Sequence, residues 1–184
     1  LVPITDGQIT FEGTELSSLE GRSLKQFRHR MQMIFQDPYA SLNPRMTVYD
    51  TLAEPLLLHG LVRKADLDQE IRELMDNVGL ARAFVRKYPH EFSGGQRQRI
   101  AIGRALATRP EFIVADEPVS ALDVTIQAQI LDLLADLTKE YGLTMLFISH
   151  DLAVIRQIAD RIAVMYHGKL VEEGSTAQVF EMPQ

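Results

Sequence analysis

The sequence contains no cysteine among its 184 residues. Disulfide bonds, thiolate nucleophiles and zinc–thiolate sites are therefore excluded, and the absence is consistent with a reducing compartment such as the cytoplasm. The chain also lacks an apolar run long enough to span a membrane, and its first residues lack the pattern of a signal peptide. We therefore expect any role at a membrane to come through a partner.

An excess of positive charge is absent as well. The net charge is -6 and the isoelectric point is near 5.4. Phosphate backbones and anionic lipid surfaces favour basic proteins, so these values argue against a nucleic-acid partner and against a polybasic membrane anchor. The length suits one compact domain, or one domain with a small insert.

An initiator methionine is missing, since the chain begins with Leu1. A short strand is expected almost at once, at residues 8–11. We therefore expect the sequence to be part of a longer protein.

The apolar pattern predicts strands that alternate with helices. Continuous apolar runs at residues 112–115 and 145–148 are typical of strands buried on both faces. Between residues 46 and 88 the pattern is helical, with one apolar face over 67–78 and a stop at Gly79. Further strands are expected at 8–11, 31–35, 161–166 and 169–171, with a hairpin turn at 167–168, and further helices at 94–108, 126–137 and 151–158. The alternation predicts an α/β fold with a mainly parallel sheet and an inserted helical stretch.

Ser93, Gly94, Gly95 and Gln96 stand at the beginning of one of these helices. A serine there can cap the helix, and glycines let the backbone come close to a ligand. The free N–H groups and the helix dipole then favour an anion. The alternative is an ordinary loop, in which Ser-Gly-Gly is common.

A pair of carboxylates, Asp116 and Glu117, directly follows the apolar run at 112–115. Ligands of open parallel sheets bind beyond the carboxyl ends of the strands. One carboxylate there can hold Mg²⁺ and the next can polarise an attacking water. The alternative is that Asp116 caps a turn and Glu117 is solvated. Asp123, a little further on, is expected to cap the next helix.

Two more polar residues follow strands that are expected at the same edge of the sheet. His150 can contact a terminal phosphate or orient a water, although Ser149 or Asp151 capping a helix with a packed histidine is the alternative. Gln36 can reach a magnesium ion through its amide oxygen, although a glutamine after a strand is usually a loop residue.

Taken in order and spacing, these motifs resemble those of the ATP-binding subunits of ABC transporters. The resemblance covers essentially the whole chain. Residues 37–44 and 120–129 look like the oligopeptide, dipeptide and nickel importer branch. The matches are Gln36 with the Q-loop, Ser93 to Gln96 with the signature, Asp116 and Glu117 with Walker B, Asp123 with the D-loop and His150 with the switch histidine.

The resemblance implies a P-loop NTPase-like fold that is incomplete here. Residues 1–44 and 94–184 would form the α/β core, and residues 45–93 a helical subdomain that ends at the signature. Two such subunits, identical or different, would sandwich two ATP molecules with Mg²⁺. Permease subunits would hold them at the cytoplasmic face of the membrane, and a solute-binding protein would act indirectly.

Roles for the motif residues also follow from the resemblance. Asp116 would bind Mg²⁺ through water, Glu117 would be the general base and His150 would contact the γ-phosphate. Gln36 would sense Mg²⁺ and couple hydrolysis to the permease. The remaining residues would bind a nucleotide that is held mainly by the partner subunit; they are Ser93, Gly94, Gly95, Gln96 and Asp123.

One departure from the family pattern matters most. No Gly-x-x-x-x-Gly-Lys-[Ser/Thr] segment occurs in the 184 residues, although the backbone of that loop cradles the phosphates and its lysine neutralises charge. We therefore expect this chain alone to bind ATP poorly, to hydrolyse it at background rate, and to have low stability or a tendency to aggregate.

Two other functions remain open from the sequence. One is an ABC-type ATPase of DNA repair or chromosome maintenance, but those proteins carry a long coiled-coil insert where this chain has a short helical stretch. The other is a non-catalytic remnant that only docks, and the presence of both Glu117 and His150 counts against it.

Overall fold

A parallel sheet of three strands lies at the centre of the computed structural model, which describes residues 6–181. The strands follow the order β3 (Met31–Ile34), β4 (Phe112–Asp116) and β5 (Thr144–Ile148). In register, Ile34 lies beside Ala115, and Asp116 lies beside Ile148. The α/β class and the parallel central sheet are therefore confirmed.

Two antiparallel pairs of strands accompany this sheet. β1 (Thr10–Phe11) pairs with β2 (Thr14–Glu15), and β6 (Arg161–Tyr166) pairs with β7 (Lys169–Ser175). The expected hairpin turn is confirmed, because His167 and Gly168 both have positive φ angles, 48° and 76°, as a tight two-residue turn requires. Within residues 6–181 neither pair joins the central sheet, so the parallel arrangement is limited to β3, β4 and β5.

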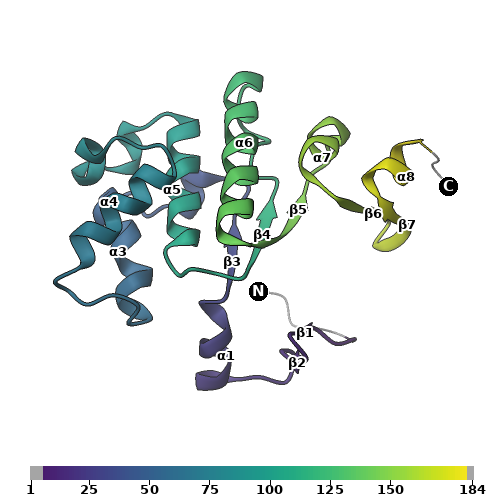
Figure 1. Ribbon diagram of the computed structural model, residues 1–184, viewed down its shortest axis with the longest axis horizontal. Coiled ribbons are helices and arrows are strands. Elements are labelled where there is room, and N and C mark those ends of the chain that lie inside the picture. The colour runs from purple at the N-terminus through teal and green to yellow at the C-terminus, as the bar shows by residue number, and fades with distance from the viewer. Residues whose placement is uncertain (1–5, 182–184) are drawn as a thin grey trace.

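Helices occupy the segments that the apolar pattern predicted, but Gly21–Arg28, Pro38–Ser41 and Thr176–Glu181 are also helical and were not predicted. Figure 1 shows α3 and α4 at one end of the molecule, α6 near its middle, and β6, β7 and α8 at the other end. Single 3-10 turns at Arg82–Arg86 and Pro89–Glu91 complete the helical stretch before Ser93, and none of the described residues there forms a strand. The helices are α1 (Gly21–Arg28), α2 (Pro38–Ser41), α3 (Val48–Leu58), α4 (Leu67–Asn77), α5 (Gly94–Leu106), α6 (Val124–Tyr141), α7 (Leu152–Ile158) and α8 (Thr176–Glu181).

Gly79 ends α4 as expected. Its φ angle is 67°, and its N–H donates to the carbonyl of Asp76 at 2.9 Å. The N–H of Leu80 donates to the carbonyl of Met75 at 2.8 Å, which satisfies a second carbonyl of the last turn. Glycine adopts this left-handed conformation without the steric penalty that a side chain would add.

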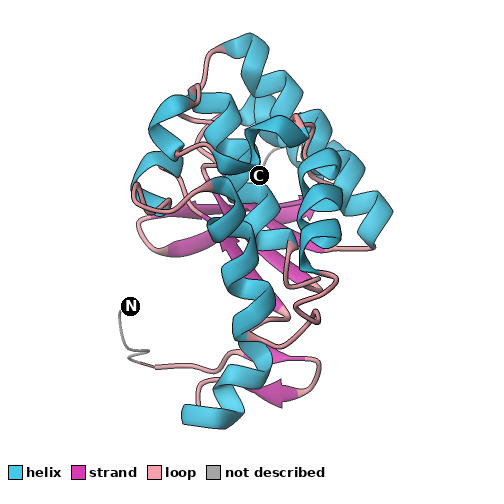
Figure 2. Ribbon diagram, turned by 90° about the vertical axis from the view of Figure 1, so that its left-hand side faces the viewer, coloured by secondary structure: helices cyan, strands magenta, loops and turns pink. Residues whose placement is uncertain are grey.

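One continuous core joins the helices to the sheet, and α5 runs through it. Gly103 of α5 lies so close to α3 and α4 that an added Cβ would be 3.3 Å from Leu52 and 3.5 Å from Val78. Figure 2 shows the strands beneath a layer of helices. The fully buried side chains of this core include Ile34, Leu52, Ile71, Ile102, Ile113, Ile130 and Leu134.

Only one face of the sheet is buried, and this corrects an expectation. Ile113 and Ala115 of β4 are buried, but Leu146 and Ile148 of β5 are 50% and 42% exposed. Successive side chains of a strand point to opposite faces, and the described residues cover one face alone. The prediction that residues 112–115 and 145–148 are buried on both faces is therefore wrong for residues 6–181.

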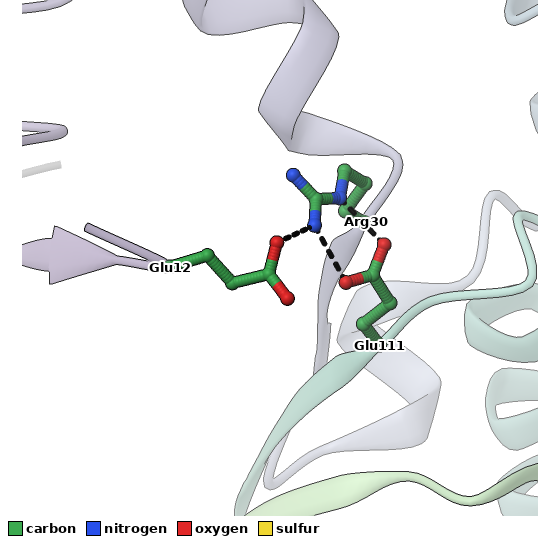
Figure 3. Close-up of polar contacts among 3 residues, drawn as sticks. All are labelled: Glu12, Arg30 and Glu111. Carbon is green, nitrogen blue, oxygen red and sulfur yellow. Dashed lines mark hydrogen bonds and ion pairs between the residues drawn. The ribbon is translucent and has the colours of Figure 1, made fainter. Parts of the chain in front are cut away.

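A charged cluster ties the N-terminal hairpin to this sheet (Figure 3). The guanidinium of Arg30 donates to Glu111, with one N–O distance of 2.6 Å, and also to Glu12 in the turn between β1 and β2. The same group lies 4.9 Å from the ring centre of Phe11. These carboxylates raise the pKa of Arg30 above its already high value, so the cluster stays charged. It fixes the short hairpin against the beginning of β4.

Two leucines of α3 test this description of the core. Leu52 is 0% exposed and Leu58 is 61% exposed. We expect Leu52→Ala to lower the free energy of unfolding by about 2–5 kcal/mol, because it leaves a cavity. The matched change Leu58→Ala should alter it by about 0.5 kcal/mol or less. Urea unfolding followed by circular dichroism measures both, and equal effects would contradict the packing of α3 on α5.

Candidate functional site

Three polar side chains meet at the carboxyl ends of the parallel strands. Gln36 follows β3, Glu117 follows β4 and His150 follows β5. Gln36 Nε2 donates to Glu117 Oε2 at 2.7 Å, and His150 Nδ1 lies 2.8 Å from Glu117 Oε1. The structure therefore brings these three residues together at one edge, with Glu117 between the other two.

The backbone of Glu117 is held in an uncommon conformation. Its φ angle is 44°, in the left-handed region that residues with side chains rarely adopt. Its N–H donates to the carbonyl of Ile148 at 2.9 Å, and its carbonyl accepts from the hydroxyl of Ser120 at 3.1 Å. Such strain persists only where the surroundings enforce it, and it is common at functional sites. The carboxylate is thus directed by contacts on both sides.

The pair formed by Glu117 and His150 is electrostatically coupled. The hydrogen bond from His150 is the largest cause that lowers the pKa of Glu117, and bonds from Ser120 and Gln36 act in the same direction. Reciprocally, the bond to Glu117 raises the pKa of His150. At neutral pH the carboxylate is charged, and the imidazole is more readily protonated than an ordinary histidine.

Of the alternative interpretations from the sequence, a packed His150 and a solvated Glu117 are wrong, whereas helix capping beside His150 is correct. The side chain of His150 is 74% exposed, so it is not packed, and that of Glu117 is 23% exposed, so it is not simply solvated. Asp151 does cap α7, because its Oδ1 accepts from the N–H of Ala153 at 2.8 Å. The Ser149 hydroxyl accepts from the N–H of Asp151 at 3.0 Å. The neighbours therefore form the cap, while the exposed imidazole of His150 bonds Glu117.

Asp116 and Gln36 have the donor atoms that Mg²⁺ prefers. Asp116 is the last residue of β4 and lies beside Ile148 of β5. Gln36 uses its amide nitrogen to bond Glu117, which leaves its amide oxygen as the group that suits a cation. Among the described residues no three His, Cys, Asp or Glu side chains gather closely enough to hold a metal ion. The oxygen atoms of Asp116 and Gln36 are of the type that Mg²⁺ binds, and in proteins water and phosphate oxygens usually complete its shell.

The Ser93 turn forms the cap that the sequence predicted. Ser93 Oγ accepts from the N–H of Gln96 at 3.4 Å, and the N–H of Ser93 donates to Gln96 Oε1 at 3.1 Å. This reciprocal capping box orients the first turn of α5. No acidic residue occupies that turn, so the positive end of the helix dipole is not neutralised locally. The geometry suits an anion placed before Gly94 and Gly95.

The two glycines of this turn have a packing role that the sequence did not reveal. A Cβ added at Gly95 would lie 2.4 Å from Cγ2 of Ile126, and one at Gly94 would lie 3.3 Å from Leu122. Leu122 lies just before α6 and Ile126 lies in its first turn, and Asp123 caps this helix by accepting from the N–H of Ile126 at 3.0 Å. The Ser93 turn and Asp123 are therefore close together, as the close approach of α5 and α6 demands.

The site residues nevertheless fall into two groups. Gln36, Glu117 and His150 form one, with Asp116 adjacent, and the Ser93 turn and Asp123 form the other. Over residues 6–181 no hydrogen bond joins the Ser93 turn to Glu117 or His150. Gln98, a fully buried glutamine of α5, was not predicted from the sequence. The sequence pattern that could have revealed Gln98 is a polar residue on the same face of α5 as the buried residues Gly95 and Ile102.

The contact between α5 and α6 gives a prediction about Gly95. We expect Gly95→Ala to lower the free energy of unfolding by about 1–3 kcal/mol, because the new methyl group overlaps Ile126. Ile126→Ala in the same chain should recover part of this loss, so the two changes should be non-additive. Urea unfolding of the two single variants and the double variant measures the coupling. Strict additivity would show that the two residues do not meet.

The coupled pair gives a second prediction, on pH. His150 should titrate above its ordinary value of about 6.5, and Glu117→Gln should return the pKa of His150 towards that value. The raised pKa of His150 adds stability that is lost as pH rises through it, and the lowered pKa of Glu117 adds stability that is lost as pH falls through it. NMR titration of the His150 imidazole in the original chain and in the Glu117→Gln variant measures the shift. A pKa of His150 that ignores Glu117→Gln would contradict the pairing.

Comparison with known proteins supports the family that the motifs suggest. The family model described as ABC transporter matches residues 1–120. Oligopeptide transport ATP-binding protein OppF of Streptococcus mutans is 56% identical over 184 residues, which cover all of this chain and 60% of the relative. Dipeptide transport ATP-binding protein DppF of Lactococcus lactis is 54% identical over 98% of this chain and 58% of its own length. The chain thus spans about 60% of the curated relatives it matches.

Solved structures share the fold. The ATP-binding cassette MJ0796, in a dimeric post-hydrolysis state bound to ADP and Pi, is 30% identical with a TM-score of 0.81, over 94% of this chain and 74% of that one. cbiO1 of Clostridium perfringens reaches a TM-score of 0.85 at 24% identity, over 97% of this chain and 69% of that one. No helix within residues 6–181 is long and apolar enough to cross a membrane. The chain belongs to the ABC transporter family.

Proposed function

We propose that this chain is part of an ATP-binding subunit, and that the whole subunit hydrolyses ATP to power the import of peptides. The observation that carries the proposal is the Glu117 carboxylate, held between Gln36 and His150 at the carboxyl end of the sheet. Relatives named for oligopeptide and dipeptide transport favour peptides over nickel as the transported solute.

Glu117 is proposed as the general base. A carboxylate at this position can accept the proton of a water that attacks the γ-phosphate. Its two oxygens are held by two different partners, so its orientation is fixed before a nucleotide arrives. Gln36 and His150 are the side chains placed to respond to that nucleotide, because both contact the base directly.

His150 is proposed to bind the γ-phosphate. Its pKa is raised by Glu117, so the ring carries a proton more readily and can donate to a phosphate oxygen. Asp116 and the amide oxygen of Gln36 would hold Mg²⁺, Asp116 through water. When bound, the ion neutralises the charge of the β- and γ-phosphates.

The Ser93 turn is proposed to serve a nucleotide that a second subunit holds. Its N–H groups and the beginning of α5 suit a phosphate, yet no described hydrogen bond joins it to the group around Glu117. The residues of this half-site are Ser93, Gly94, Gly95, Gln96 and Asp123. A second copy of the chain or a related subunit would supply the other half, and the dimeric state of the MJ0796 cassette supports this arrangement.

The helices before Ser93 are proposed to carry the coupling to the permease. We divide the chain into an α/β core of residues 1–44 and 94–184 and a helical subdomain of residues 45–93. Gln36 leads directly into α2, and Arg104 of α5 donates to the carbonyl of Ser41 in α2 at 2.6 Å. Movement at Gln36 would thus reach α5. Permease subunits would hold the protein at the cytoplasmic face of the membrane, next to a solute-binding protein.

The 184 residues alone are proposed to be inactive. They contain no Gly-x-x-x-x-Gly-Lys-[Ser/Thr] segment, and without it the phosphates lack their backbone cradle and their lysine. The residues of the site would then act only together with a phosphate loop supplied by a longer chain.

Hydrolysis assays on two lengths of protein test the proposal. We expect the 184-residue chain to release phosphate from Mg·ATP at background rate. A full-length protein that contains it should turn over, and Glu117→Gln should lower its kcat by about 10²–10⁴-fold. The matched change Glu140→Gln, at an exposed carboxylate of α6, should leave kcat unchanged. Turnover by the 184-residue chain that falls on Glu117→Gln would contradict the proposed inactivity. A full-length protein insensitive to Glu117→Gln would contradict the proposed base.

A further inference from the structure

Gln98 breaks the rule that buried polar groups are paired. Its side chain is 0% exposed, and among the described residues its Nε2 and Oε1 are the buried side-chain atoms that have no hydrogen-bond partner. The other two buried polar residues are satisfied within their own helical turns. The Thr51 hydroxyl donates to the carbonyl of Thr47 at 2.8 Å, and the Thr108 hydroxyl donates to the carbonyl of Ala105 at 3.3 Å.

An unpaired amide inside a core lowers stability. It loses its hydrogen bonds to water on folding and gains none in return. A methionine has a similar length and shape and would carry no such penalty. A polar residue at such a position is expected where function, rather than stability, requires it. Gln98 therefore calls for a functional explanation.

The place of Gln98 in α5 suggests what that function is. Gln98 follows Gly95 by three residues, so the two share one face of the helix. At Gly95 this face touches Ile126 of α6, next to Asp123. Gln98 thus lies one turn behind the Ser93 turn, in the helix that packs on α6. Among the described residues it is the buried polar residue nearest in sequence to both the capping box and the tight glycine contact.

The segment between β4 and α6, which contacts Gly94 through Leu122, has main-chain groups that can change hydrogen-bond partner. Between β4 and α6 the N–H of Ser120 donates to the carbonyl of Glu117 at 3.2 Å, and the N–H of Leu122 donates to the carbonyl of Val119 at 3.1 Å. These are single turns outside regular helix or strand. Main-chain groups in such a segment can change partner at lower cost than those in the middle of a helix or sheet.

We propose that Gln98 is a positioning residue that sets the distance between the Ser93 turn and Asp123. Its amide pairs with main-chain groups of residues 118–123 in a second arrangement of the α5–α6 contact, which nucleotide binding favours. The inference rests on the proposed function, in which both the Ser93 turn and Asp123 bind nucleotide. Gln98 itself does not touch the nucleotide, so it acts on the rate of turnover and not on nucleotide affinity.

Gln98→Met in the full-length protein, assembled with its permease subunits, tests the inference. We expect the melting temperature to rise by about 2–4 °C, because the unpaired amide is gone. We expect kcat for Mg·ATP to fall by about tenfold or more, because the turn is misplaced, with KM unchanged. Thr108→Val is the matched control at a satisfied buried hydroxyl, and it should lower the melting temperature without changing kcat.

Other outcomes would overturn the inference. If Gln98→Met raised the melting temperature and left kcat unchanged, the Gln98 amide would lower stability without serving turnover. A lowered melting temperature for both Gln98→Met and Gln98→Leu, or failure of both to fold, would show that the amide is already paired. An active wild type with an equally active Gln98→Met contradicts this inference alone, whereas an inactive wild type contradicts the proposed function as well.

Discussion

The close packing of α5 on its neighbours is the constraint on which the rest of the structure depends. At Gly95 the helix approaches α6 so closely that a methyl group would overlap Ile126, and at Gly103 it approaches Leu52 of α3 and Val78. Because Ser93 begins α5 and Arg104 near its end bonds α2, this packing sets the place of the Ser93 turn. A shift of α5 would therefore move the turn, α2 and the helical stretch together.

A second constraint acts at the end of β4, where local preferences give way to function. Glu117 holds a left-handed backbone conformation that glycine would adopt more easily. Glycine has no carboxylate, however, and the hydrogen bonds to Ile148 and Ser120 hold the strained backbone in place. Gln98 is the counterpart in the core, a polar side chain where an apolar one would be more stable. Both exceptions lie beside groups that we propose to bind nucleotide.

Features that depend on neighbouring residues were predictable from the sequence, whereas those set by distant ones were not. The caps at Ser93 and Asp123 and the stop at Gly79 were predicted correctly, since each is decided within one helical turn. The meeting of Gln36, Glu117 and His150 followed from the rule for parallel strands. The exposed face of β5 and the contact of Gly95 with Ile126 were missed, because they depend on which distant segments cover a surface.

The pairing of Glu117 with His150 also bears on when the proposed base would be able to act. A carboxylate with a lowered pKa is a weak base, so Glu117 accepts a proton poorly while His150 bonds it. In the proposed function, a phosphate oxygen that attracts the imidazole would compete for that bond. Loss of the bond would raise the pKa of Glu117 towards its ordinary value, so the proposed base would strengthen only when the terminal phosphate is in place. Because Gln36 holds the second oxygen, the carboxylate need not lose its orientation in the exchange. The same contact that suppresses the base would thus make its strength depend on the nucleotide.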